Sequence, residues 1–254
     1  MDFSGLKIDK NVLDYYYSQE FNFNRFKNVD PYGVVYRLLD HAKNQLDIEI
    51  GALFVAMIAW GSRKVIFPTA LNMLSNEMSW SPSKFIIDRQ YLDSYKNAKN
   101  NCVYRTLNTS SFKLVCDNLY KVLAENNKLK PSESLESLFK GKKTIEVISD
   151  ICDWLSPAKV GTINKSACKR ICMYVRWMTR KEGPDLGIWS SRDQSDLYAV
   201  MDVHVCKLTR NLLKTKGPSW KACEELTGIF KQWDSEDPLK YDIALMTLSD
   251  RLNI

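Results

Sequence analysis

The sequence predicts an all-α protein, and three observations support this prediction. The 254 residues include only ten glycines. Runs that alternate β-branched and polar residues, the pattern of a half-buried strand, are few. Apolar residues instead recur at helical spacing along most of the chain. The composition, 45% hydrophobic and 26% charged, is ordinary for a globular protein and argues against a disordered or fibrous chain.

The expected helices follow one another from residue 31 onward. Their ranges by apolar spacing are 31–43, 47–60, 66–78, 112–126, 133–140, 144–155, 166–180, 203–214, 219–232 and 238–252. Three of them have a start signal, a capping residue or a proline that fits the first turn, at Asp30-Pro31, Ser132 and Asp237-Pro238. Helix breakers are expected at Pro82, at Gly141, and within 156–161 and 183–187.

Membrane, export and metal classes are disfavoured. The longest apolar stretch, residues 51–61, is far shorter than the roughly 20 residues that span a bilayer. The first ten residues lack the pattern of a secretory signal, so a soluble cytoplasmic protein is expected. The seven cysteines form no C-x-x-C pair, and only His41 and His204 accompany them. We therefore expect reduced thiols, no metal site and no cofactor.

The positive charge is concentrated in one segment. The chain has 36 Lys and Arg against 30 Asp and Glu, a formal charge of +6. Residues 157–182 contain seven basic residues and one acid, so this segment alone accounts for the excess. A local basic stripe indicates a polyanionic partner, most simply nucleic acid. A solvated helix face without a partner explains the charge equally well.

The helix expected at 166–180 has two different faces. Lys169, Arg176 and Arg180 are predicted on one face, in a row roughly 16 Å long that could follow a phosphate backbone. The opposite face is apolar and is predicted to be buried, with Ala167, Ile171, Tyr174, Val175 and Met178.

Two aspartates occupy distinctive positions. Asp202 ends an apolar run and precedes residues at helical spacing, so we expect an N-cap whose carboxylate accepts the amides of His204 and Val205. The local pattern favours this structural role, although an ionised carboxylate also suits stabilisation of a cationic transition state. Asp242 lies beside the apolar stripe of the final helix, where it could reach a pocket or be an ordinary exposed residue.

The stretch VMDVHVCKLTRNL, 200–212, resembles the V-D-x-H-V-x-R-x-x-x-R-L motif of helix-hairpin-helix DNA glycosylases. In that superfamily the aspartate is catalytic, and bifunctional members have a catalytic lysine upstream. Three further stretches resemble the hallmark runs of a bacterial family labelled DUF2400: residues 47–66, 166–189 and 237–248. The resemblance implies a helix-hairpin-helix glycosylase-like fold of two helical lobes with a cleft between them. The expected lobes are 1–65 plus 200–254, and 66–199.

The spacing is most similar to that of archaeal 8-oxoguanine DNA glycosylases, because Lys169 precedes Asp202 by 33 positions. This resemblance implies that Lys169 is the nucleophile, with Lys165 as the alternative. It also implies that Asp242 reads the flipped base, but Met246 stands where that group has a stacking aromatic residue. The usual L-P-G-[VI]-G-x-[KT] hairpin motif is matched only in part, by residues 155–167.

The function that the resemblance implies is excision of an oxidised purine, with 8-oxoguanine as the first candidate, by a bifunctional glycosylase and abasic-site lyase. The resemblance implies that Lys169 and Asp202 are catalytic and that Asp242, Met246, Trp60 and Arg63 bind the substrate. The expected DNA-binding residues are Lys64, Lys159, Gly161, Lys165, Arg170, Arg176 and Arg180. His204 is expected to pack or to form a hydrogen bond near the helix start rather than to catalyse.

The expected partner is double-stranded DNA containing a damaged base, bound by a monomer at the nucleoid. One alternative is a DNA-binding protein that keeps the glycosylase fold without turnover, which the atypical hairpin and Met246 motivate. A second alternative is a helical interaction protein whose basic stripe is incidental.

Overall fold

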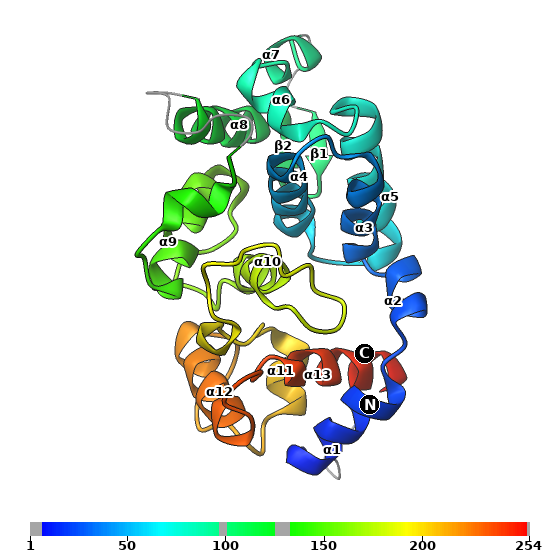
Figure 1. The fold of residues 1–254 in the computed structure, drawn as a ribbon, viewed down its shortest axis with the longest axis vertical. Helices are drawn as coiled ribbons and strands as arrows, with labels where there is room; N and C mark the ends of the chain where they lie inside the picture. Colours follow the sequence, from blue (N-terminus) through cyan, green and yellow to red (C-terminus); the bar gives the residue numbers. More distant parts are fainter. Residues whose placement is uncertain (1–6, 97–100, 125–132, 253–254) are drawn as a thin grey trace. The chain divides into compact units, whose positions relative to one another are not determined.

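The computed structural model describes residues 7–96, 101–124 and 133–252, and these residues are mostly helical (Figure 1). The prediction of an all-α fold is confirmed at this level, because the described residues contain only one sheet, a short pair of antiparallel strands. The chain divides into two compact units. One unit combines the chain up to Phe23 with Gly161–Ile254, and the other is Asn24–Val160. We refer to them as the terminal unit and the central unit.

The central unit is built around α4 (Gln45–Ile58), whose residues are nearly all buried. Asn44 caps this helix by accepting the Asp47 amide at 2.8 Å. Helices α3, α5 and α6 pack around α4 (Figure 1). The other elements from α2 to η5 are α2 (Phe23–Val29), α3 (Tyr32–His41), α5 (Arg63–Asn72), the π-helical turn η2 (Met73–Glu77), α6 (Pro82–Ile87), α7 (Tyr91–Ser94), β1 (Cys102–Tyr104), β2 (Leu107–Asn108), α8 (Thr109–Leu123), the 3₁₀ helix η4 (Leu135–Phe139), α9 (Thr144–Trp154) and the 3₁₀ helix η5 (Ser156–Ala158).

The terminal unit joins the two ends of the chain. Helix α13 (Lys240–Leu252) packs against α1 (Lys10–Tyr15) and the π-helical turn η1 (Tyr16–Glu20). The core of the terminal unit includes Trp177 and Trp189. The ring of Trp189 meets that of Tyr174 edge-on, with 5.7 Å between the ring centres. The remaining elements are α10 (Lys169–Thr179), the 3₁₀ helix η6 (Gln194–Asp196), α11 (Val203–Leu208) and α12 (Trp220–Trp233).

Several predicted boundaries differ from the observed ones. Helix α10 begins at Lys169 rather than at 166, because Cys168 has a left-handed backbone with φ 46°. Helix α11 ends at Leu208, six residues before its predicted end. Pro82, predicted to break a helix, is the first residue of α6, where a missing N–H costs nothing. The start signal at Ser132 and residues 125–126 of a predicted helix lie outside the described residues.

The division into units also differs from the predicted lobes, which placed residues 24–65 with the C-terminus. In the structure, α3 and α4 pack against α5 and α6, so these residues belong to the central unit. Residues 161–199 belong instead to the terminal unit. Lys169 and Asp202, predicted on different lobes, are therefore in the same unit.

No helix among the described residues combines the length and apolar character needed to cross a membrane.

Candidate active site

A lysine and an aspartate meet where two helices of the terminal unit begin. Lys169 is the first residue of α10, and Asp202 is the N-cap of α11. The Lys169 Nζ donates a hydrogen bond to Asp202 Oδ2 over 2.7 Å. The side chains are 36% and 24% exposed, so both groups are accessible to solvent. The pair is therefore an ion pair at the surface of this unit rather than one sealed in its core.

The N-cap geometry positions the Asp202 carboxylate. The residue has an extended backbone, and its Oδ1 accepts the Val205 amide at 2.9 Å, which confirms the predicted cap at this amide. One oxygen thus holds the helix start and the other faces Lys169. Burial alone favours the neutral acid, but the Lys169 charge, its hydrogen bond and the Val205 amide outweigh burial and lower the pKa of Asp202. The carboxylate is therefore held ionised beside the lysine.

The apolar face of α10 positions Lys169. Ile171, Tyr174, Val175 and Met178 are buried, as the helical spacing predicts. The helix is thereby anchored in the core, while Lys169 stays at its solvent-accessible end. Ser166 supports the approach to the helix, because its Oγ accepts the Cys168 amide at 3.1 Å.

The predicted cationic row on α10 is wrong for two of its three residues. Arg176 is 5% exposed and Arg180 is fully buried. The Arg176 guanidinium pairs with Asp185 at 3.3 Å and lies 3.6 Å from Asp242 Oδ2. Carboxylates from outside the helix surround this part of α10, so the two arginines neutralise buried charges. They do not offer exposed contacts for DNA.

Arg180 makes the most extensive of these contacts. Its Nε and one terminal nitrogen donate to both oxygens of Asp237, at 2.8 and 2.7 Å. It also pairs with Asp185 at 3.2 Å and donates to the Tyr17 hydroxyl at 2.9 Å. Burial alone lowers the pKa of Arg180, but the bonds to Asp237 and the charge of Asp185 outweigh it and raise that pKa. This arginine therefore joins the N-terminal segment, the segment after α10 and the segment before α13.

Asp242 lies in the same buried cluster and is not the exposed helix aspartate that the sequence left open. Its Oδ2 accepts the Val200 amide at 3.0 Å, two residues before Asp202. Its Oδ1 is buried and has no hydrogen-bond partner among the described residues. Burial raises the pKa of Asp242 to about 6, against the opposing charge of Arg176. Met246, one helical turn further along α13, is half-buried.

The residues of the partial hairpin span the boundary between the units. Helix α9 belongs to the central unit and α10 to the terminal unit. Gly161 has φ +97°, and a Cβ at this position would lie 2.1 Å from Ser166 Oγ, so the turn requires glycine. Lys159 and Lys165 are exposed, and Arg170 is half-buried.

The other predicted substrate and DNA contacts, Trp60, Arg63 and Lys64, lie in the central unit. Arg63 pairs with Asp30 at 3.2 Å, Lys64 is exposed and Trp60 is half-buried. His204, predicted to pack near the start of α11, is exposed.

A second basic segment, residues 203–221, is not among the predicted site residues. Residues 203–221 contain five basic residues and no acid. All five are exposed, and none forms an ion pair with another described residue: Lys207, Arg210, Lys214, Lys216 and Lys221. A regional charge count could have found this segment. The segment 203–221 follows Asp202 directly along the chain. Its charges have no acidic partner among the described residues, whereas buried aspartates neutralise part of the charge in residues 157–182.

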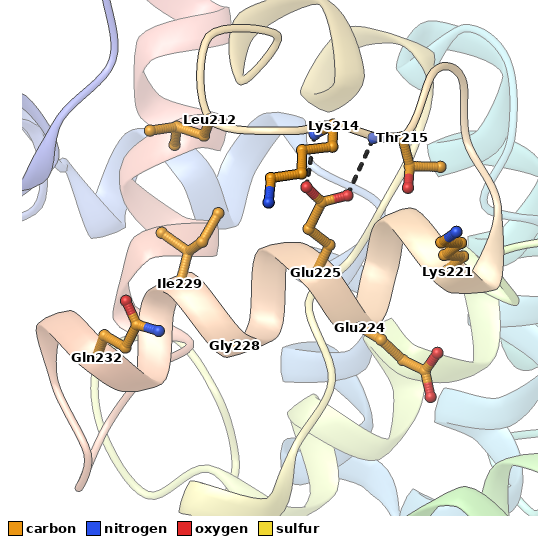
Figure 2. A pocket seen from close by; sticks show the side chains of 9 residues that line it. All are labelled: Leu212, Lys214, Thr215, Lys221, Glu224, Glu225, Gly228, Ile229 and Gln232. Atoms are coloured by element: carbon orange, nitrogen blue, oxygen red, sulfur yellow. Dashed lines mark hydrogen bonds between the residues drawn. The ribbon is translucent and has the colours of Figure 1, made fainter.

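Part of this segment borders a hollow of about 850 Å³ against α12 (Figure 2). Glu225, on α12, accepts the backbone amides of Lys214 and Thr215 at 2.5 and 3.0 Å. These two amides, that of Lys214 first, lower the pKa of Glu225. The carboxylate thereby ties the basic loop to the helix, and Figure 2 shows the Lys214 and Lys221 side chains at the hollow. None of the predicted site residues lines it.

The described residues contain no group of three His, Cys, Asp or Glu side chains that could hold a metal ion.

Comparison with known proteins identifies a family without an assigned activity. A family model described as "Protein of unknown function (DUF2400)" matches residues 30–250. No curated protein and no solved structure matches the chain.

Proposed function

Given that the chain belongs to the DUF2400 family, we propose that it is a DNA glycosylase with abasic-site lyase activity. The observation that carries the proposal is the 2.7 Å contact between Lys169 and Asp202. A solvent-accessible amine beside an ionised carboxylate is the arrangement that lysine-based base excision requires. The glycosylase resemblance of residues 200–212 implies the catalytic role of Asp202, and the similarity in spacing to archaeal 8-oxoguanine glycosylases implies that of Lys169.

The reaction uses Lys169 as the nucleophile. After a proton has left Nζ, its lone pair attacks the sugar C1′, and the bond from C1′ to the base nitrogen breaks with its electron pair on the base. The base takes up a proton as it leaves. Opening of the sugar ring then gives a protonated Schiff base between C1′ and Nζ. Loss of a proton from C2′ allows elimination of the 3′ phosphate.

Asp202 supplies the negative charge in this scheme. Positive charge develops on the sugar as the base leaves, and a carboxylate that is already ionised stabilises it without a prior proton transfer. The cap to Val205 holds the carboxylate in place, so little reorganisation is needed during the reaction. The same carboxylate can take up a proton at the later steps.

The partner we propose is duplex DNA from which the damaged base is extruded. The support lies in the exposed cations of residues 203–221, which follow Asp202 along the chain and lack carboxylate partners among the described residues. Such cations bind phosphates and release counterions. Lys165 of the same unit and Lys159 of the central unit are also exposed, and we propose that each binds phosphate.

The substrate we propose is an oxidised purine, with 8-oxoguanine as the first candidate. The resemblance of Asp242 to a base-reading aspartate supports this class. Its Oδ1 has no hydrogen-bond donor among the described residues, so it retains acceptor capacity for a purine N–H.

Reduction with borohydride tests the proposal, because it converts a Schiff base into a stable amine link between protein and DNA. We expect an adduct with a duplex containing 8-oxoguanine, loss of the adduct in Lys169→Gln, and retention in Lys181→Gln. Lys181 is an exposed lysine of the same unit and serves as the matched control. Lys165→Gln tests the alternative nucleophile. An undiminished adduct in a folded Lys169→Gln variant would rule out the assignment.

A DNA-binding protein without turnover is the second candidate, which Met246 and the atypical hairpin favour. It predicts salt-dependent duplex binding by the wild type and no adduct or strand cleavage with any lesion. A panel of duplexes with oxidised purines, oxidised pyrimidines and abasic sites separates the two candidates.

A further inference from the structure

The tip of the hairpin formed by β1 and β2, in the central unit, carries an arginine in a constrained position. Arg105 directly follows β1, and Tyr104 pairs with Leu107 across the turn. Arg105 has a left-handed backbone with φ +51°, which is uncommon for a residue with a side chain. The residue is exposed. The turn thus presents a guanidinium to solvent.

The Arg105 side chain lies over a tryptophan from a distant segment. Its guanidinium carbon is 4.2 Å from the centre of the Trp60 ring. Gly61 has φ +103°, and a Cβ there would lie 2.4 Å from an Arg105 nitrogen. The absence of a side chain at Gly61 therefore permits the close approach.

Tyr104 locks the same two segments together. Its hydroxyl donates to the Trp60 carbonyl at 2.6 Å, and its ring meets the indole edge-on at 6.2 Å. The hydrogen bond, the ring contact and the stacked guanidinium leave Arg105 with little rotational freedom to lose when it binds a ligand.

Arg105 also lacks a carboxylate partner among the described residues, unlike Arg63 and Arg89 of the same unit. Arg63 pairs with Asp30, and Arg89 pairs with Asp117 at 3.3 Å. The forked donors of Arg105 therefore combine a defined orientation with a charge that no described acid neutralises.

We propose that Arg105, stacked on Trp60, binds a phosphodiester of the nucleic-acid backbone. A planar guanidinium matches two phosphate oxygens. Its single charge suits a phosphodiester, which carries one negative charge, better than free phosphate, which carries between one and two at neutral pH. The proposal rests on the proposed function only in that the partner is DNA. It does not depend on the chemistry of Lys169.

The salt dependence of binding tests the inference with the full chain and an undamaged duplex. Loss of one phosphate contact reduces the slope of log K against log salt by about 0.9. We expect this reduction in Arg105→Ala, with an affinity about tenfold lower at moderate salt. Arg105→Lys keeps the charge, so it retains the slope and loses part of the affinity. The matched control is Arg37→Ala, which removes another exposed guanidinium that stacks on a ring of this unit, 5.2 Å from the centre of Phe67.

A slope for folded Arg105→Ala equal to that of the wild type overturns the inference, as does an equal fall in Arg37→Ala. Inorganic phosphate provides the other arm, because Arg105-dependent binding of phosphate with no change in the DNA slope assigns the site to a free anion. A wild type that binds duplex but forms no borohydride adduct contradicts only the proposed catalytic function, and the slopes still decide the role of Arg105. A wild type that binds no duplex contradicts both.

Discussion

Replacing Arg180 with methionine is expected to destabilise the terminal unit. The arginine is fully buried and pairs with Asp237 through two hydrogen bonds and with Asp185 at 3.2 Å. Methionine preserves much of the apolar volume and removes the charge. The variant therefore leaves Asp237 without this partner and Asp185, whose side chain is also fully buried, with Arg176 alone.

The size of the effect follows from these contacts. Removing one partner of a buried ion pair costs about 3–5 kcal/mol, because the remaining charge is left uncompensated. Asp237 is 15% exposed and Asp185 keeps Arg176, so the lower end, about 3 kcal/mol, applies. With a urea dependence of about 2 kcal/mol per molar, the midpoint of unfolding falls by about 1.5 M.

Urea unfolding followed by circular dichroism measures this change at neutral pH. The matched control is Arg210→Met, which removes an exposed arginine that forms no ion pair with a described residue, and its midpoint is expected to shift by less than about 0.3 M. A loss below about 1 kcal/mol for Arg180→Met, or equal shifts for the two variants, would show that the buried network does not stabilise this unit.

Three further changes test separate parts of the structure. Asp202→Asn keeps a capping side chain, so its free energy of unfolding is expected to lie within about 1 kcal/mol of the wild type. Asp202→Ala removes the cap and is expected to lose about 1 kcal/mol more than Asp202→Asn in a denaturant titration. Equal losses in the two variants would contradict the capping role. Burial raises the pKa of Asp242 from 3.8 to about 6, so the native state keeps this proton where the unfolded chain has lost it. The free energy of unfolding of the wild type, relative to that of Asp242→Asn, is therefore greatest below about pH 4 and falls by roughly 3 kcal/mol as the pH rises through 6. Urea titrations at a series of pH values measure this difference, and a difference that does not change with pH would contradict the prediction. Gly161→Ala is expected to lower the free energy of unfolding by about 2 kcal/mol, because φ is positive and the new Cβ would meet Ser166. Gly141→Ala, where φ is +76° and the space is open, is expected to lower it by only about 1 kcal/mol. Thermal unfolding compares the two variants, and equal losses would contradict the close contact at Gly161.

Local patterns in the sequence predicted most of the larger helices and the N-cap at Asp202. The apolar spacing of 166–180 identified the buried face of α10, because a single helix determines which of its residues share a face. The N-cap at Asp202 was also predictable, because it depends on residues within one turn. Both features rest on contacts between near neighbours in the chain.

Features that depend on distant residues were not predictable in this way. A helical wheel places Arg176 and Arg180 opposite the apolar face, but it cannot show that Asp185, Asp237 and Asp242 converge on them. The helical wheel therefore predicts a solvent-facing row of three cations, of which only Lys169 is accessible to solvent in the structure. The predicted lobes differ from the observed units for the same reason, because the packing of α3 and α4 on α5 and α6 is a tertiary contact that no local pattern shows.

The contact between Lys169 and Asp202 was expected from the resemblance alone. The two residues are 33 positions apart, and no periodic pattern joins them. The structure brings them together because Asp242 holds the chain at Val200 while the core anchors α10. Arg105 had no local signal, because its stack on Trp60 joins residues that are 45 positions apart.

Peptide mapping of the borohydride-trapped complex is the most direct test of Lys169 as the nucleophile. The wild-type chain is reduced on a duplex containing 8-oxoguanine and digested, and mass spectrometry locates the residue bearing the sugar remnant. We expect a modified Lys169, in the peptide that begins α10, and no modified Lys165. A remnant on another residue, or no adduct with any lesion duplex, contradicts the assignment of Lys169 and Asp202 as the catalytic pair.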